Sequence, residues 1–305
     1  MRPLVVAVEQ GGRPLMLIPL GLARRRGLAV LSFLGGEVTD YHAPLVAADW
    51  RERLGPGGFA PLWARILAAL PSADQVRLVH MPAEILGVPN PFETLPGDRP
   101  KDVALSFPLP ASMEAFRRTL VTHFVADTRR RRRRLAERGE IAFEVARTPA
   151  AMQAALAAMM ERKSRRYLET GNRDAFARPA FRAFYERMSQ RAPGDGAVHG
   201  SLLTVGGAVV AAHWGLVHRG RFYCLPPGWS AGEWHRYAVG RILLEELVMA
   251  SIADGLEVFD LTIGDEPYKS DWTDRRMDLL ALDLPRSPAG RLLLAAEAAH
   301  RALRE

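Results

Sequence analysis

Two stretches of the chain repeat the same order of apolar runs and turn residues. Residues 4–34 contain two apolar runs around a Gly-Gly pair and a third after an Arg-Gly pair, and residues 201–225 repeat this order. Gly-Gly between apolar runs favours a tight hairpin, because both residues adopt positive φ easily. Each stretch therefore predicts a three-stranded antiparallel meander. Their likeness predicts a duplicated domain, with chance resemblance between two meanders as the alternative.

Other segments show helical or extended periodicity. The predicted helices cover residues 61–70, 111–138, 149–162, 181–191, 238–253 and 288–304, and the predicted strands cover 75–80, 140–145 and 257–261. Residues 82–101 are rich in proline and predict an irregular connection. The terminal helix is amphipathic and basic, which favours packing against the body of the protein, with docking on a membrane surface as the alternative.

The composition is that of a soluble globular protein. The chain has 305 residues, of which 48% are hydrophobic and 25% charged, enough for two compact lobes with a sizeable core. No run reaches the ~18 uninterrupted apolar residues of a membrane span, and Met1–Gln10 reads as a strand, not as a signal peptide. The single cysteine, Cys224, excludes an intrachain disulfide and a cysteine-based metal cluster. We expect a cytoplasmic protein without a metal.

A net charge of +7 favours an anionic partner: a phosphorylated cofactor, a nucleic acid or an acidic lipid surface. Six consecutive arginines, residues 129–134, lie in the predicted helix 111–138, which ends before Gly139. Consecutive residues point around a helix, so these side chains cannot form one flat patch. The simplest interpretation is a solvated helix end whose cations suit the dipole, and the alternative is contact with phosphate, polysaccharide or lipid. Because no nucleic-acid-binding motif accompanies the run, we expect no dedicated nucleic-acid module.

An irregular loop at residues 226–241 opens the apolar helix that follows. A helix start presents free backbone N–H groups, and the helix dipole adds positive potential there. Gly240 lets an anion approach the backbone, and Arg236 or Arg241 can add charge. The loop therefore predicts a site for a phosphate or pyrophosphate.

Two segments around this loop resemble a known superfamily. Residues 236–247, Arg-Tyr-Ala-Val-Gly-Arg-Ile-Leu-Leu-Glu-Glu-Leu, look like the acyl-CoA pyrophosphate loop and helix of GNAT acetyltransferases. Residues 258–272, from Val-Phe-Asp-Leu through Pro-Tyr-Lys to Trp, resemble the branch named for cellulose-biosynthesis acyltransferases (CelD/BcsL type). That branch is related to the FemAB-type peptidyltransferases. The resemblance covers roughly residues 116–283, and more loosely the whole chain.

The resemblance implies an α/β (α+β) fold of tandem GNAT-like lobes, each a mixed, mainly antiparallel sheet flanked by helices. Residues 1–110 would form a degenerate lobe, because no glycine loop and helix follow its meander, and residues 111–305 the catalytic domain. Acetyl-CoA or another acyl-CoA would be the co-substrate. The residues implied for binding it are Arg236, Tyr237, Ala238, Val239, Gly240 and Arg241. The loop departs from the superfamily pattern, since Arg236 is one position too far from Gly240 and Ile242 replaces a glycine or alanine.

Acyl transfer to an amine needs a base, donors for the developing oxyanion and an acid for the leaving thiolate. His213 lies mid-strand and is either a base or a core histidine. Asp260, at the end of a strand, either faces the ligand or caps a turn. Glu266 could hold an amine or a sugar hydroxyl, or could be an exposed loop carboxylate.

Tyr268 and Lys269 are the strongest candidates for chemistry. In FemAB-type relatives a lysine after such a tyrosine lies at the reaction centre. By this resemblance Lys269 would stabilise an oxyanion and Tyr268 would protonate the thiolate. A surface lysine beside a core tyrosine is the alternative.

The function predicted is acyl-CoA-dependent N-acyl transfer to an amine-bearing sugar or envelope precursor. The resemblance implies a role in exopolysaccharide or cell-envelope synthesis, in the cytoplasm or at the inner face of an anionic membrane. Two alternatives stay open: a FemAB-like transferase that uses aminoacyl-tRNA, and a non-catalytic protein that senses an anionic ligand.

Overall fold

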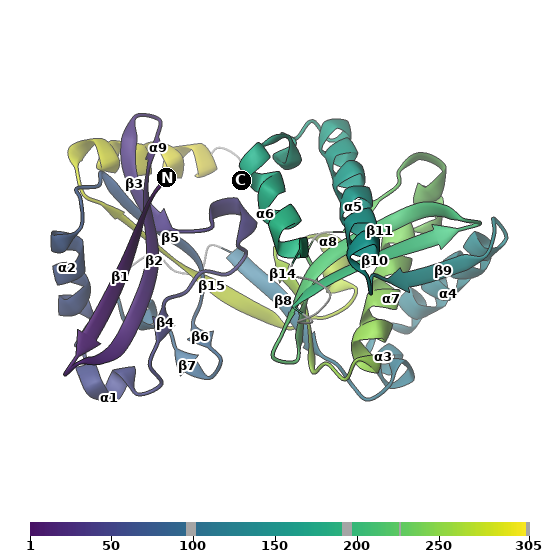
Figure 1. Cartoon of the computed structure of the whole chain (residues 1–305), viewed down its shortest axis with the longest axis horizontal. Coiled ribbons are helices and arrows are strands. Elements are labelled where there is room, and N and C mark those ends of the chain that lie inside the picture. Colours follow the sequence, from purple (N-terminus) through teal and green to yellow (C-terminus); the bar gives the residue numbers. More distant parts are fainter. Residues whose placement is uncertain (96–101, 191–196, 226, 303–305) are drawn as a thin grey trace. The chain divides into compact units, whose positions relative to one another are not determined.

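The computed structural model describes residues 1–95, 102–190, 197–225 and 227–302, with side chains as far as residue 299. The chain divides into two compact units (Figure 1). Unit 1 comprises Met1–Ala104 and Met277–Glu305, and unit 2 comprises Leu105–Arg276. The expected ranges were 1–110 and 111–305. Residues after 276 group with unit 1 instead, because β15 (Arg276–Pro285) pairs antiparallel with β5 (Gln75–Pro82).

Unit 1 contains the first predicted meander. β1 (Arg2–Gln10), β2 (Arg13–Arg25) and β3 (Leu28–Phe33) pair antiparallel in sequence. The first turn has Gly11 at φ 59° and Gly12 at φ 72°, which is the geometry that Gly-Gly favours. β3 pairs in parallel with β5, and the strand order of this unit is β1-β2-β3-β5-β15.

Helices connect β3 to β5, and the longest of them confirms the predicted helix 61–70, whereas the glycine-rich loop before it was not expected. Short elements come first: the 3-10 helix η1 (Gly36–Val38), β4 (Leu45–Val46) and α1 (Trp50–Leu54). The main helix, α2 (Phe59–Ala69), follows Gly55-Pro-Gly-Gly58. The loop was missed because it lies more than twenty residues beyond the end of β3. The hairpin β6 (Glu84–Ile85) and β7 (Val88–Pro89), the 3-10 helix η2 (Pro91–Thr94) and α9 (Pro288–Ala302) complete the unit.

Unit 2 contains the second predicted meander. β9 (Ile141–Val145), β10 (Val198–Val205), β11 (Ala208–His218) and β12 (Arg221–Tyr223) pair antiparallel in sequence. β14 (Val258–Ile263) pairs in parallel with β12, and α7 (Val239–Ala253) connects them. β8 (Asp102–Pro108), within which the unit boundary falls, lies beside β14, and β13 (Gly228–Trp229) pairs with β11.

The predicted helix 111–138 is wrong as one element, because it forms two helices. α3 (Met113–Thr119) and α4 (Thr122–Ala136) are separated by Leu120 and Val121, whose ψ angles of 158° and 127° are extended. The break falls in Thr-Leu-Val-Thr, where β-branched residues have low helix propensity. The remaining helices are α5 (Pro149–Glu169), α6 (Pro179–Gln190), α8 (Pro267–Ser270) and the 3-10 helices η3 (Ala175–Ala177) and η4 (Gly232–Tyr237).

Two different cores cover the faces of the sheet in unit 2. Trp214 of β11 packs with methionines of α5, including the buried pair Met159 and Met160. On the other face, aromatic rings follow one another at centroid distances of 4.9–6.2 Å, in the order Phe222, Phe259, Phe107, Phe116 and Trp272. Across the described part of the chain, every helix is too short or too polar to cross a membrane.

Candidate functional site

The start of α7 has the backbone conformation that the phosphate prediction requires. Ala238 precedes the helix in the left-handed conformation, at φ 53° and ψ 48°, and accepts hydrogen bonds from the amides of Arg241 and Ile242 at 2.9 and 3.1 Å. No side chain caps this end. Within the described residues, the Val239 and Gly240 amides have no hydrogen-bond acceptor. Two N–H donors at the positive end of a 15-residue helix suit an anion.

Gly240 allows close packing in the structure. A Cβ atom at this position would lie 3.3 Å from the indole ring of Trp229 on β13. The glycine thus lets α7 approach Trp229 closely. The first turn of the helix is therefore fixed by apolar contact as well as by its own hydrogen bonds.

Cationic side chains surround this helix start. Arg241 lies over the Phe124 ring at 4.5 Å and forms an ion pair of 3.0 Å with Asp127. Arg236 lies over the Tyr237 ring at 4.9 Å, and Arg131 donates to the Arg236 carbonyl oxygen at 2.7 Å. Because Arg236 is exposed and forms no ion pair with any described residue, its guanidinium is available to an anionic ligand.

The six consecutive arginines on α4, residues 129–134, fall into a half-buried group and an exposed group. Arg131 and Arg132 are half-buried, and Arg132 forms ion pairs with Glu246 and, at 3.7 Å, with Glu245 of α7. Hydrogen bonds from Arg131 and then Arg130 hold the pKa of Asp127 well below its ordinary value. The other members are exposed, and among the described residues three of them form no ion pair: Arg129, Arg133 and Arg134. The run therefore wraps around the helix, as the sequence indicates.

Lys269 belongs to α8, and its side chain reaches the turn that connects β14 to this helix. The residue is 2% exposed. Its ammonium donates to the carbonyl oxygens of Ile263 at 2.6 Å and of Thr262 and Gly264 at 3.3 Å, and pairs with Glu266 at 2.9 Å. An ammonium has three donors, and these acceptors already occupy them. Lys269 thus holds the turn together, and it can donate to a substrate oxyanion only by giving up one of these bonds.

Asp260 is also committed to structural contacts. It is 1% exposed, accepts from Arg221 at 2.9 Å, and accepts from the Thr262 amide at 2.8 Å. Both residues lie within β14, so Asp260 stands inside the strand and not at its end, and the second bond joins it to Thr262, which has a positive φ of 59°. A threonine in that conformation is strained, and such strain persists only where the surroundings fix it.

Tyr268 and Cys224 lie near Lys269. Burial raises the pKa of the Cys224 thiol to about 12, against the opposing charge of Lys269. Burial around the Tyr268 hydroxyl raises the pKa of that residue, although 42% of its surface is exposed. Tyr268 therefore stays protonated at neutral pH and can donate a proton. Glu266 precedes α8, and its side chain is 54% exposed, so it can face an acceptor.

The structure does not bring His213 to this group. His213 is fully buried, and its ring stacks on Phe222 at 5.5 Å. Burial and then the neighbouring His199 lower its pKa well below 6.5. Neither ring nitrogen forms a hydrogen bond of ordinary geometry with a described residue, although the Leu225 backbone opposes the lowering of the pKa. In this conformation the side chain is closed to solvent.

Lys163 of α5 belongs to the neighbourhood of Glu266 and was not singled out from the sequence. Burial lowers its pKa, while the Glu266 charge opposes that shift. Its ammonium lies 5.4 Å from the ring centroid of Tyr167, one helical turn away. The signal available in the sequence is this i, i+4 spacing, which places Lys163 and Tyr167 on one face of the helix.

Comparison with known proteins agrees with this arrangement. Residues 122–270 match the family model of the acetyltransferase (GNAT) domain. The curated proteins yield no significant match. The fold is similar to that of FemX, with a TM-score of 0.62 and 10% identity, covering 95% of this chain and 90% of that one.

Two other solved structures are similar over the same length. The C-terminal domain (DUF2156) of a putative lysylphosphatidylglycerol synthetase from Agrobacterium fabrum has a TM-score of 0.59 and 14% identity, covering 98% of this chain and 88% of that one. L-PGS from Bacillus licheniformis has a TM-score of 0.50 and 12% identity, covering 95% and 87%. At these identities the likeness defines the fold alone. The protein therefore has the expected α/β fold, with a mixed, mainly antiparallel sheet flanked by helices, and the match to the GNAT domain model, residues 122–270, lies within unit 2.

Proposed function

We propose that unit 2 transfers an acyl group, acetyl in the simplest case, from a CoA thioester to a primary amine. The observation that carries this proposal is the start of α7, where the uncapped amides of Val239 and Gly240 lie beside Arg236 and Arg241. A diphosphate has the charge and the acceptors that such a helix start satisfies. The match of residues 122–270 to a GNAT domain supports this interpretation.

We further propose that the acceptor is an amine-bearing sugar or a related envelope precursor. The resemblance of residues 258–272 to the CelD/BcsL branch supports an acceptor of exopolysaccharide synthesis. Glu266 supports an amine, because its half-exposed carboxylate can hold an ammonium or a sugar hydroxyl. The net charge of +7 is compatible with work in the cytoplasm at an anionic membrane face.

The reaction forms a C–N bond and breaks the C–S bond of the thioester. The neutral amine attacks the carbonyl carbon, and the excess proton on nitrogen passes to Glu266 or to water. The thiolate of CoA leaves and accepts a proton from Tyr268, which water reprotonates; the raised pKa keeps this tyrosine protonated beforehand but makes it a weaker acid. Lys269 keeps the β14–α8 turn in place and adds positive potential near the developing oxyanion.

Calorimetric titration of the full chain with acetyl-CoA and with desulfo-CoA tests the donor. We expect both to bind with similar affinity, because the site recognises the diphosphate. Release of free thiol in the presence of a panel of amino sugars then tests the acceptor. Absence of CoA binding would remove this proposal, whereas CoA binding without turnover on any amine would support the non-catalytic alternative.

An aminoacyl-tRNA-dependent transferase is the second candidate. It is supported by Arg129, Arg133 and Arg134, which are exposed cations without acidic partners among the described residues, and by the fold shared with FemX. Aminoacyl-tRNA should then bind with a steep salt dependence, and replacing these three arginines with glutamine should abolish binding. If the triple variant keeps full acetyl-CoA turnover and the wild type ignores aminoacyl-tRNA, this candidate is excluded.

A further inference from the structure

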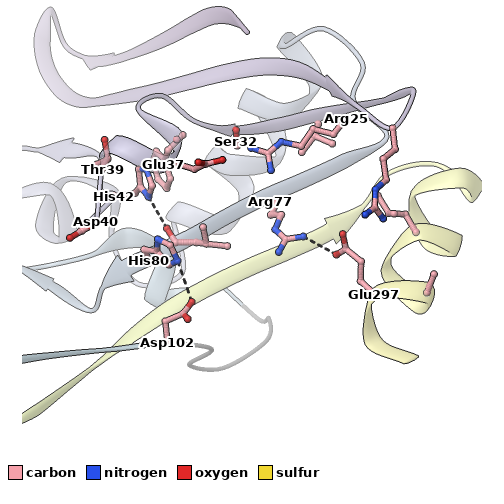
Figure 2. A pocket seen from close by; sticks show the side chains of 17 residues that line it. Arg25, Ser32, Glu37, Thr39, Asp40, His42, Arg77, His80, Asp102 and Glu297 are labelled. Atoms are coloured by element: carbon pink, nitrogen blue, oxygen red, sulfur yellow. Dashed lines mark hydrogen bonds and ion pairs between the residues drawn. The ribbon is translucent and has the colours of Figure 1, made fainter. Parts of the chain in front are cut away.

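Unit 1 contains a hollow that the proposed acyl transfer does not use. Its volume is about 1040 Å³, close to the upper end of the ~300–1,000 Å³ of small-molecule sites. Strands β3 and β5, the connection after β3 and helix α9 surround it (Figure 2). Polar side chains gather in two groups in this view, arginines near α9 and imidazoles with carboxylates at the other end.

The arginine group contains two guanidinium groups without an ion pair among the described residues, in a hollow that Glu37, Asp40, Asp102 and Glu297 also line. Arg25 and Arg26 line the hollow at the turn between β2 and β3, and neither forms an ion pair with a described residue. Arg77 differs, because it pairs with Glu297 at 2.8 Å and lies 3.9 Å from Asp283. Two free guanidinium groups on one wall suit a phosphate or carboxylate, which accepts several N–H bonds at once.

The imidazole group, His42 and His80, contains two buried ring nitrogens that have no hydrogen-bond partner among the described residues. His42 is 7% exposed, and its Nδ1 lies 3.2 Å from the Val79 carbonyl oxygen, so Nδ1 carries the proton and Nε2 is an acceptor. His80 Nε2 lies 3.3 Å from the Asp102 carboxylate, and its Nδ1 has no partner among the described residues.

The backbone around these rings is held in an uncommon conformation. His80 has a positive φ of 57°, and its carbonyl oxygen accepts from the His42 amide at 3.0 Å. The two rings lie at 6.0 Å, and Phe33 stacks on His42 at 5.4 Å. A strained histidine with an unsatisfied ring nitrogen is costly in a purely structural position, and such strain gathers at ligand sites. Burial lowers the pKa of His42 to about 4, so the ring stays a neutral acceptor at physiological pH.

We propose that this hollow binds a small organic phosphate that also carries hydroxyl or amine groups. Its phosphate would contact Arg25 and Arg26, and its hydroxyl or amine groups would lie at the end of the hollow that His42, His80 and Asp102 line. The Asp102 carboxylate beside His80 favours a ligand with an amine at that end. A phosphorylated amino sugar has this distribution of charge and size. The proposal concerns unit 1 by itself and does not depend on CoA binding to unit 2.

The test is calorimetry on the full chain with glucosamine 6-phosphate as the probe. We expect saturable binding, with glucosamine and inorganic phosphate each bound at least about tenfold more weakly, since each lacks one group of contacts. Glucose 6-phosphate, which lacks the amine but keeps the phosphate, should bind with an affinity between that of glucosamine 6-phosphate and that of inorganic phosphate. Failure of glucosamine 6-phosphate to bind at millimolar concentration would overturn the proposal.

Substitutions of residues that line the hollow test whether glucosamine 6-phosphate binds there. In Arg25→Gln/Arg26→Asn the affinity for glucosamine 6-phosphate should fall about tenfold or more, to the level of glucosamine, and Asn tolerates the positive φ of 50° at position 26. Arg2→Gln/Arg13→Gln removes the same charge from β1 and β2 outside the hollow and should bind as the wild type does. Equal losses in both pairs, or none in the first, would contradict the site. His42→Phe should keep the stacking on Phe33 and weaken binding several-fold.

Acetyl-CoA titration of the same samples separates the two proposals. Arg25→Gln/Arg26→Asn should bind acetyl-CoA unchanged, which also shows that the variant is folded. If acetyl-CoA does not bind to the wild type but glucosamine 6-phosphate does, the function proposed for unit 2 fails and the unit 1 site stands.

Discussion

Units 1 and 2 both place a helix between two parallel strands, but the two helices differ in what they bury. In unit 1, α2 connects β3 to β5 and buries only apolar side chains: Phe59, Trp63 and Ile66. In unit 2, α7 connects β12 to β14 and buries Glu245 and Glu246 among its apolar residues. Burying a carboxylate is costly unless it is paired. Arg117 and Arg132 provide that pairing, Arg117 to Glu245 at 2.8 Å.

The two units place their charged side chains at different positions. Neither helix has a side chain that caps its first turn, so uncapped amides alone do not distinguish them. What distinguishes α7 is the network of arginines from α3 and α4, which its buried acids hold in place. In unit 1 the unpaired arginines lie instead at the β2–β3 turn, beside the hollow with two imidazoles. The two units thus share a helix between parallel strands but gather their charged side chains at different sites.

The largest effect should come from removing the buried cation of unit 2. Lys269→Met leaves three carbonyl groups and Glu266 without their donor, so the free energy of unfolding should fall by about 3 kcal/mol. Arg77→Met in unit 1 breaks a partly exposed ion pair and should cost about 0.5 kcal/mol. Urea unfolding of both variants measures the contrast. Equal losses would show that the ammonium of Lys269 is not held as described.

The next effect concerns the helix starts. Gly240→Asp adds a negative charge beside the free amides of α7, and we expect it to weaken CoA binding about a hundredfold. Gly240→Ala adds only a Cβ 3.3 Å from Trp229 and should keep most of the affinity. Gly57→Asp places the same charge before α2, where a Cβ meets open space and Asp is among the residues that best tolerate the positive φ of 71°, and it should leave CoA binding unchanged. Calorimetry of the three variants with CoA distinguishes charge from crowding.

Tyr268→Phe should have a smaller effect, on turnover alone. A thiolate is a good leaving group, so loss of the proton donor should lower kcat about thirtyfold and leave CoA affinity unchanged. Because the pKa of Tyr268 is raised above 10.0, the wild-type rate should show no loss from this residue below that pH. Tyr223→Phe, on β12, is the matched control and should keep its rate. A variant Tyr268→Phe with full turnover would remove this residue from the mechanism.

Most of the fold was predictable because its signals are local. Gly11-Gly12 and Gly206-Gly207 fix their hairpins by their own φ angles, so both meanders followed from the sequence. β15 was missed, since its pairing with β5 joins residues some two hundred positions apart. The site was predictable only in part. Gly240 and Arg241 mark a helix start that can be predicted from neighbouring residues. The carbonyl oxygens that bind the Lys269 ammonium surround it only once β14 and α8 have come together.

The last contrast is the response of the two units to acid. Burial lowers the pKa of His42 in unit 1 and of His199 in unit 2 to about 4, and it lowers that of His213 well below 6.5. Below pH 6.5 the unfolded chain takes up protons that these folded sites reject. Stability should therefore fall as the pH drops from 6.5 towards 4, and not above that range.

Each of these histidines should cost about 1 kcal/mol at pH 6 relative to pH 8. Unit 2 has two of them and unit 1 has one, so acid should weaken unit 2 more. Urea unfolding at both pH values measures this in His42→Phe and in His199→Phe/His213→Phe, where the double variant should remove about twice as much of the pH dependence. If His42→Phe removes the larger share, the pKa values of His199 and His213 are less depressed than their burial implies, and His213 becomes a stronger candidate base.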